Sequence, residues 1–390
     1  MHIAFLGHVA RFSGAEIELL RIVEATSGAV YGDALSRPRW TLLLAEDGPL
    51  VPALREAGAT VEVIPLAERT RAMKRTDLSP GLAQARAATD TVAYIARVAQ
   101  RLRALSPDVV SAVSLKAAAY GAFAARLAGR PFVVHLHDQI AATYLAAPAV
   151  KPMRALLGTL PSAIITPSQA TLDTVGSIRP GIRTAVIPHP VPRPAVPVPV
   201  RPTVQRIGII GRLTPWKGQD VFLRAFAKAV PDPKITAVVI GAAMFGEERY
   251  EQELRALAAT LGLGGRVEFT GFREDVPAEM ARLDLLVHAS VLTEPGATVV
   301  FEAMAAGLPV IAARSGGAAE QIDDGVHGLL HTPGDVDALA AAMRRAIDDA
   351  PLRRRLAAAG RELTEPLTAR RVFERWNREI YTHLAPMRDR

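Results

Sequence analysis

The chain has 390 residues and no cysteine, which excludes disulfides, thiolate metal sites and cysteine nucleophiles. This length predicts two domains. Hydrophobic residues make up 49% but aromatic residues only 5%, so the cores are expected to be filled mainly by alanine, valine and leucine. The net charge of +7 is compatible with anionic partners, but no basic stripe with interleaved aromatic residues is present, so nucleic acid is not an expected partner.

The first half of the chain alternates short apolar runs with alanine-rich helical runs, such as 15–24 and 82–105. Continuous apolar strands separated by helices predict a parallel sheet that is covered on both faces. The predicted strands are 2–7, 41–46, 61–66, 109–114, 131–137, 163–168 and 184–188. Residues 2–7 are interpreted as the first strand and not as a signal peptide, and no apolar stretch reaches about 18 residues. We therefore expect a cytoplasmic protein, with peripheral contact at the inner membrane face left open through the basic loop 68–77.

The first strand is followed by "GHVARFSGAE", in which Gly7 and Gly14 are too far apart for a dinucleotide-binding fingerprint. Gly14 could allow the backbone to approach a ligand closely. Ser13 and Glu16 have the spacing of a capping box, and both interpretations can hold together.

A later strand ends in "VVHLHDQ", which places His135 and His137 on one strand face. A metal pair is conceivable, but no third ligand with characteristic spacing is evident, so no metal site is predicted. We expect His137 to contact substrate and His135 to be packed or capped. Asp138 could orient an imidazole or cap the next helix.

The proline-rich segment 188–204 predicts an extended linker, after which the alternating pattern restarts. The predicted strands beyond it are 206–212, 235–242, 266–272, 283–290, 308–313 and 328–332. We predict an α/β protein with two doubly wound, Rossmann-like domains and a cleft between them: 1–188 together with 369–390, and 189–368. The segment 369–385 has the apolar spacing of a helix that packs on a domain.

Two segments of the second domain carry candidate chemistry. The loop "GRLTPWKG" (211–218) offers Arg212 and Lys217, which suit a diphosphate, although a solvated loop would look the same. In "EPGATVVFEAMAAGLPV" (294–310), we expect Glu294 in a loop, a helix from about Thr298 and Glu302 one turn inside. The N–H groups at the start of such a helix form an anion site. The alternative is a purely structural role, in which Glu294 interacts only with the helix dipole and Glu302 pairs with an arginine.

Together these residues resemble the retaining glycosyltransferases of family 4, which have the GT-B fold. The resemblance is carried by the two glutamates with "EAMAAGLPV", by "GRLTPWKG" upstream and by "GGAAEQIDDGVHGLLHTPGD" downstream, and more weakly by "SGAE" and "HLHD". Two departures are visible. His189 in "VIPHPV" stands where asparagine is usual, and Glu294-Pro295-Gly296-Ala297 replaces the common E-P-F-G.

The resemblance implies a role for each matching position. Arg212 and Lys217 would neutralise the leaving diphosphate, Glu294 would bind a hydroxyl of the donor sugar, and Glu302 would bind the ribose. His137 would be a further catalytic residue, beside the donor sugar and the acceptor. The remaining donor-binding positions would be Gly14 near the phosphates, Phe272 at the nucleobase, and Gly296, Ala297, Thr298 and Val299 at the sugar and β-phosphate.

The resemblance further implies a hexosyltransferase of bacterial glycoconjugate or natural-product biosynthesis that keeps the anomeric configuration and needs neither metal nor cofactor. The donor would be a UDP or GDP sugar, and the acceptor a saccharide, a lipid-linked sugar or a small molecule. The alternatives are a nucleotide-sugar epimerase or hydrolase of the same fold and, from another class, an NAD-dependent oxidoreductase.

Overall fold

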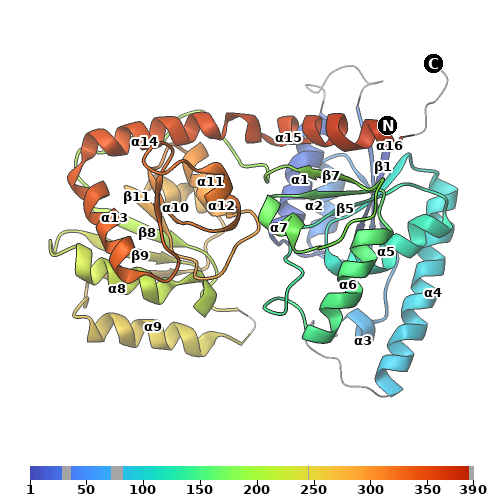
Figure 1. Ribbon diagram of the computed structural model, residues 1–390, viewed down its shortest axis with the longest axis horizontal. Coiled ribbons are helices and arrows are strands. Elements are labelled where there is room, and N and C mark those ends of the chain that lie inside the picture. The colour runs from blue at the N-terminus through green and yellow to red at the C-terminus, as the bar shows by residue number, and fades with distance from the viewer. Residues whose placement is uncertain (29–36, 72–81, 245, 386–390) are drawn as a thin grey trace. The chain divides into compact units, whose positions relative to one another are not determined.

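The computed structural model describes residues 1–28, 37–71, 82–244 and 246–385. The chain forms two compact units: unit 1 contains Met1–Pro190 and the segment from Ala369 onward, and unit 2 contains Val191–Thr368 (Figure 1). The boundary between them lies two residues beyond the predicted one. The basic loop 68–77 lies largely outside the described residues, and its first four residues, Glu68–Arg71, are helical.

Unit 1 is built on a parallel sheet with the strand order β3-β2-β1-β4-β5-β6-β7. Its strands are β1 (His2–Gly7), β2 (Arg39–Leu44), β3 (Thr60–Val63), β4 (Val109–Ala112), β5 (Phe132–His135), β6 (Ala163–Thr166) and β7 (Arg183–Val186). Its helices are α1 (Gly14–Ser27), α2 (Leu50–Glu56), α3 (Glu68–Arg71), α4 (Leu82–Leu105), α5 (Leu115–Leu127), α6 (Ala147–Thr159), α7 (Gln169–Asp173), α15 (Ala369–Trp376) and α16 (Thr382–Leu384).

Alternate residues of the central strand, β1, enter two separate cores, which explains why residues 3–6 are all apolar. Ala4 and Leu6 pack with α4 and α5 on one face, whereas Ile3 and Phe5 pack with α1, α2 and α15 on the other. Because both faces are covered, the sheet is doubly wound, as the continuous apolar strands predict.

Unit 2 repeats this plan with the parallel strand order β10-β9-β8-β11-β12-β13. Its strands are β8 (Arg206–Ile210), β9 (Thr236–Ile240), β10 (Val267–Gly271), β11 (Leu285–His288), β12 (Val310–Ala313) and β13 (Leu329–His331). Its helices are α8 (Gln219–Ala229), α9 (Glu248–Thr260), α10 (Val276–Ala281), α11 (Thr298–Ala305), α12 (Gly316–Gln321), α13 (Val336–Asp348) and α14 (Ala350–Leu363), with 3₁₀ turns η2 (Pro215–Lys217) and η3 (Glu365–Leu367).

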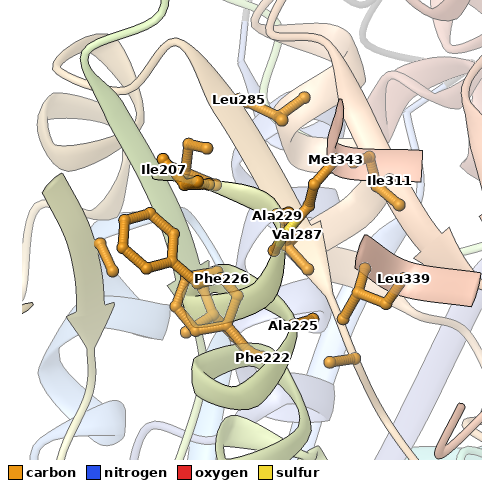
Figure 2. Packing of buried hydrophobic residues seen from close by; sticks show 14 of the residues in the cluster. Ile207, Phe222, Ala225, Phe226, Ala229, Leu285, Val287, Ile311, Leu339 and Met343 are labelled. Atoms are coloured by element: carbon orange, nitrogen blue, oxygen red, sulfur yellow. The ribbon is translucent and has the colours of Figure 1, made fainter. Parts of the chain in front are cut away.

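One face of this second sheet is covered by α8 and α13. The rings of Phe222 and Phe226 of α8 are tilted relative to one another at a centroid distance of 6.2 Å and fill the space beneath Ile207 (Figure 2). Leu339 and Met343 of α13 pack beside them. The opposite face is covered by α11 and its neighbours, so this sheet is also buried on both sides.

The proline-rich segment, for which the sequence predicts an extended linker, is bound to unit 2 after residue 190. Val191 donates its N–H to the carbonyl of Leu367 at 2.9 Å, and Val198 donates to the carbonyl of Ala306 at 2.7 Å. Although it is irregular, this segment is tied to unit 2 by backbone hydrogen bonds.

The C-terminal helical segment also differs from the expectation of one helix. A π-helical turn, η4 (Asn377–Tyr381), separates α15 from α16. Val372, Phe373, Trp376, Ile380 and Tyr381 are all buried in the core of unit 1. The Tyr381 hydroxyl lies 2.8 Å from Nε2 of His135 and 3.1 Å from Oγ of Ser111. The extra residue of the π-helical turn thus occurs next to the polar contacts of Tyr381, which lie inside an otherwise apolar interface.

Candidate functional site

The candidate residues of unit 2 follow two adjacent strands, β8 and β11. The strand order reverses between these two strands, since β9 and β10 continue from β8 on one side and β12 and β13 from β11 on the other. Open parallel sheets bind ligands at the carboxyl ends of the strands at such a reversal. Arg212 and Lys217 follow β8, and Glu294 follows β11, so the fold explains why segments so distant in sequence meet here.

Glu294 is the centre of this cluster and is only 7% exposed. Its Oε1 accepts hydrogen bonds from Nζ of Lys217 at 2.7 Å, from Nε2 of His288 at 2.9 Å and from the hydroxyl of Ser290. Within the described part of the chain, no hydrogen bond reaches its other carboxylate oxygen, Oε2. The cluster therefore fixes the carboxylate in place and leaves one oxygen available to a ligand.

The electrostatics keep Glu294 ionised. Burial alone raises the pKa of its carboxyl, but the Lys217 ammonium and His288 more than offset that effect and hold the pKa well below its usual range. Nδ1 of His288 accepts the N–H of Ala313 at 3.4 Å, so Nε2 carries the proton that is donated to Glu294. Glu294 is thus a permanent hydrogen-bond acceptor.

Lys217 and Arg212 both lie beside the indole of Trp216. Nζ of Lys217 is 4.6 Å from the ring centroid, and the guanidinium carbon of Arg212 is 5.9 Å from it. The two predicted diphosphate ligands are therefore brought together on one short loop. The pairing of Lys217 with Glu294 also links the two segments that were proposed separately from the sequence.

The segment after Glu294 enters α11 at Thr298, as expected. Ala297 precedes the helix with φ 43°, a left-handed conformation that a non-glycine residue seldom adopts. Glycines allow this loop to pack tightly, because a Cβ at Gly316 would lie 1.9 Å from the carbonyl oxygen of Glu294. Gly317 donates its N–H to that carbonyl at 3.3 Å. The backbone of Gly296, Ala297, Thr298 and Val299 is thus held at the helix start by its neighbours.

The two remaining predicted positions of unit 2 lie at different depths. Phe272 directly follows β10 and is 67% exposed, which leaves its ring and backbone accessible. Glu302 lies inside α11 and is partly buried. Unit 2 therefore holds nine predicted site residues, on the loops after β8, β10 and β11 and in α11, which are Arg212, Lys217, Phe272, Glu294, Gly296, Ala297, Thr298, Val299 and Glu302.

In unit 1, Gly14 is the first residue of α1, and a Cβ placed on it would meet no atom within 4 Å. The fold of the free protein therefore gives no reason for a glycine at this position. The predicted capping box is wrong: the hydroxyl of Ser13 donates to the carboxylate of Glu16, and no side chain caps the helix. The Ser13 hydroxyl is oriented toward the acid, and its oxygen makes no hydrogen bond to a backbone N–H of the first turn.

His137 lies two residues beyond β5, next to a buried carboxylate that the sequence did not indicate. Its Nδ1 is 3.4 Å from Oε2 of Glu18, and Nδ1 of His189 is 2.5 Å from the same oxygen. The two imidazoles stack at a centroid distance of 5.0 Å with an interplanar angle of 19°. Glu18, His137 and His189 are drawn from α1, the loop after β5 and the segment after β7, and their ligand atoms all lie within 4.8 Å of one another.

Burial and charge act in opposite directions in this cluster. Burial raises the pKa of the Glu18 carboxyl, but His189 and His137 lower it to about 2. Burial lowers the pKa of His137 below 6.5 against the opposing charge of Glu18. At neutral pH a carboxylate thus lies beside an imidazole, His137, that is uncharged.

His135 and Asp138, which lie close to His137 in the sequence, have different surroundings. His135 is 1% exposed, as expected for a packed residue, and contacts the edge of Trp376 at a centroid distance of 4.3 Å. Asp138 accepts a hydrogen bond from the Tyr144 hydroxyl. It does not cap the next helix, α6, whose N-cap is Ala146.

Four residues of these clusters were not predicted as site residues from the sequence. His288 and Ser290 alternate at the end of an apolar strand, a polar pattern that could have indicated them. His189 was visible only as a departure from the family pattern. Glu18 lies on a helix face that is otherwise apolar, and only the tertiary structure brings it to the two histidines.

Comparisons with known proteins agree with this architecture. The family model described as Glycosyltransferase Family 4 matches residues 50–193, and the one described as Glycosyl transferases group 1 matches residues 198–363. The two matches lie almost wholly in unit 1 and unit 2, respectively.

Two curated relatives illustrate the range of glycosyltransferases to which the chain is similar. The chain is 38% identical over 160 residues to 2-deoxystreptamine glucosyltransferase of Streptomyces kanamyceticus, covering 40% of each chain. It is 35% identical over 153 residues to the lipopolysaccharide core biosynthesis glycosyltransferase LpsE of Rhizobium meliloti, covering 39% of this chain and 42% of the relative. The chain spans between 22% and 45% of the length of the curated relatives compared.

Solved structures resemble the chain over its full length. HepE of Anabaena, crystallised with UDP, has a TM-score of 0.79 and 28% identity over 98% of this chain and 100% of its own. Among the described residues, no helix is both long enough and apolar enough to cross a membrane. With two domain matches and this structural likeness, the chain is a protein of the GT-B fold that is related to glycosyltransferases over both of its units.

Proposed function

We propose that the protein is a retaining family 4 hexosyltransferase, which moves a sugar from a nucleoside-diphosphate sugar to an acceptor hydroxyl. The observation that carries the proposal is the Glu294 cluster. Three donors hold Oε1 of an ionised carboxylate, Oε2 has no hydrogen bond among the described residues, and the start of α11 follows directly. An acceptor for sugar hydroxyls thus adjoins an anion-binding helix end.

In this proposal the residues of unit 2 bind the donor. Oε2 of Glu294 accepts a sugar hydroxyl, and the N–H groups of residues 296–299 bind the sugar and the β-phosphate. Glu302 accepts from the ribose hydroxyls, and the backbone at Phe272 contacts the nucleobase. UDP and GDP are the proposed nucleotides, and the likeness to HepE, crystallised with UDP-glucose, supports UDP.

In unit 1, Gly14 lies near the donor phosphates and His137 beside the donor sugar and the acceptor. Gly14 supports this role because the free protein leaves open space around it. The acceptor is a saccharide, a lipid-linked sugar or a small molecule, a range that matches the names of the relatives.

Transfer takes place on the face from which the nucleotide departs. The bond between the anomeric carbon and the phosphate oxygen breaks, the acceptor oxygen bonds to the same face, and the acceptor proton passes to the departing phosphate. Arg212 and Lys217 neutralise the charge that develops on the diphosphate, so no metal ion is required for that role. Lys217 can keep its bond to Glu294 and still donate, because an ammonium has three donors.

The proposal is tested first by melting the full-length protein with UDP, GDP, dTDP, ADP and CDP, each with Mg²⁺ and with EDTA. A ligand that binds only the native state raises the melting temperature, and we expect one diphosphate to do so in EDTA. The matching nucleotide sugar should then be consumed with an acceptor panel, and proton NMR of the product should show the anomeric configuration of the donor.

Arg212→Ala and Lys217→Ala should each lower the transfer rate by about 10²–10³-fold, because each removes one contact to the leaving group. Lys228→Ala is the matched control, since Lys228 lies on the surface of the same unit with its side chain 53% exposed, and it should transfer at the normal rate. Normal transfer by the first two variants, or stabilisation by NAD alone, would refute the proposal.

A further inference from the structure

The cluster of Glu18, His137 and His189 in unit 1 has the composition of a metal site. Two imidazole nitrogens and one carboxylate oxygen are the donor set of many catalytic zinc and non-haem iron sites. The three side chains come from separate segments of the chain, which explains why no ligand spacing was visible in the sequence. His135 is not part of this group: its Nε2 is hydrogen-bonded to Tyr381, and the three ligand atoms that lie close together belong to Glu18, His137 and His189.

The geometry of the cluster leaves one potential ligand atom without a hydrogen bond among the described residues. Nδ1 of His137 is buried and, within the described residues, has no hydrogen-bond partner. This nitrogen is therefore a potential metal ligand that makes no hydrogen bond within the described part of the protein.

The distances between the ligand atoms are close to those around a tetrahedrally coordinated ion. Ligand atoms bound to one zinc ion with bonds of about 2.0–2.2 Å lie about 3.4 Å apart. Nδ1 of His137 and Oε2 of Glu18 are already 3.4 Å apart, whereas the 2.5 Å contact of Glu18 with His189 must open. All three ligand atoms lie within 4.8 Å of one another. His189 lies in an irregular segment after β7, so its side chain can move without breaking a helix or a strand.

The cluster is also accessible. The side chains of His137 and His189 are 15% and 13% exposed, whereas that of Glu18 is 8% exposed. The carboxylate thus lies deepest and the imidazoles border the surface. Three protein ligands leave a fourth position for water or a ligand hydroxyl, which is the arrangement of an open zinc site and not of a closed structural one.

We propose that Glu18, His137 and His189 bind a divalent transition metal ion such as Zn²⁺, with one coordination position open. The metal site shares His137 with the proposed transfer reaction, but binding of the ion requires neither donor nor acceptor. A site rich in nitrogen disfavours Mg²⁺, the ion that usually bridges phosphate oxygens, and the diphosphate ligands Arg212 and Lys217 belong to unit 2.

The test is calorimetric titration of Zn²⁺ into the full-length, chelator-treated protein, followed by elemental analysis after dialysis. We expect one tightly bound ion per chain. Glu18→Gln and His189→Asn should each weaken binding by at least about tenfold, because each removes one of three ligands. His383→Asn is the matched control, since it removes an exposed imidazole of the same unit, and it should bind zinc as the wild type does.

Melting temperatures without metal identify any variant that fails to fold. If Glu18→Gln does not fold, the test rests on His189→Asn. Absence of stoichiometric zinc in the wild type, or equal affinity in wild type and His189→Asn, would overturn the proposal. Because no donor or acceptor is present, failure here leaves the proposed transfer reaction untouched, and failure of transfer leaves the metal site untouched.

Discussion

At the scale of single residues, two buried carboxylates remain charged because cations or imidazoles surround them. Glu294 is held by Lys217 and His288 in unit 2, and Glu18 lies between two histidines in unit 1. A buried charge without partners would be too costly to keep. Each carboxylate is therefore a strong hydrogen-bond acceptor at a fixed position, and neither has the raised pKa of a general acid.

His135 makes the stability of unit 1 depend on pH. Burial, together with His137, lowers its pKa to about 3, whereas the ordinary value is 6.5. Between these values the unfolded chain binds a proton that the native state does not, so the native state loses stability as the pH falls below 6.5. Between about pH 6.5 and about pH 5, the expected loss from this group is about 2 kcal/mol.

Urea unfolding at about pH 7.5 and about pH 5 measures this effect. His135→Gln does not titrate but can still hydrogen-bond to Tyr381, so its unfolding free energy should change less between the two conditions. An identical pH dependence in both proteins would show that His135 does not bind the proton. The comparison uses the change with pH, so a general loss of stability in the variant does not affect it.

At the scale of elements, the site of unit 2 depends on glycines that allow loops to approach one another. Gly316, with φ 52°, opens α12 directly against the carbonyl of Glu294. We expect Gly316→Ala to lower the unfolding free energy by about 1–3 kcal/mol, because the added Cβ forces backbone strain and displaces the loop. Binding of the preferred diphosphate should weaken in the same variant.

Gly264→Ala is the control for this prediction. Gly264 lies in the same unit, and a Cβ there would meet no atom within 4 Å. Urea unfolding and calorimetric titration of the diphosphate should show a near-normal protein. If Gly316→Ala behaved in the same way, the close contact between the two loops would not be important for the site.

At the scale of the whole molecule, unit 1 is built from two distant parts of the chain. Trp376 of the returning segment is 2% exposed and contacts His135 and Phe5. We expect Trp376→Ala to cost about 3–5 kcal/mol, the usual cost of removing a buried aromatic ring. Urea unfolding measures the loss, and Val92→Ala, at a 67% exposed position of the same unit, should cause almost none. A normal midpoint for Trp376→Ala would contradict this role.

Local pattern by itself determined the elements and their order. The strand β1 and the helix α4 have the predicted bounds, and α11 begins at Thr298. Several strands end earlier than predicted, as β11 does at His288 instead of residue 290. The residues beyond its end, Ala289 and Ser290, are fully buried beneath the site loops. Burial makes loop residues look like strand residues in the sequence.

The positions that resemble a known family, from Arg212 to Glu302, could be named from the sequence because they lie in short contiguous motifs. Only the tertiary structure decided which side chains meet. Lys217 pairs with Glu294 because β8 and β11 are neighbours, and Glu18 reaches His137 and His189 because α1, β5 and β7 belong to one sheet unit. Hydrophobic periodicity specifies an element locally, whereas contacts between elements depend on strand order and packing, which no local pattern encodes.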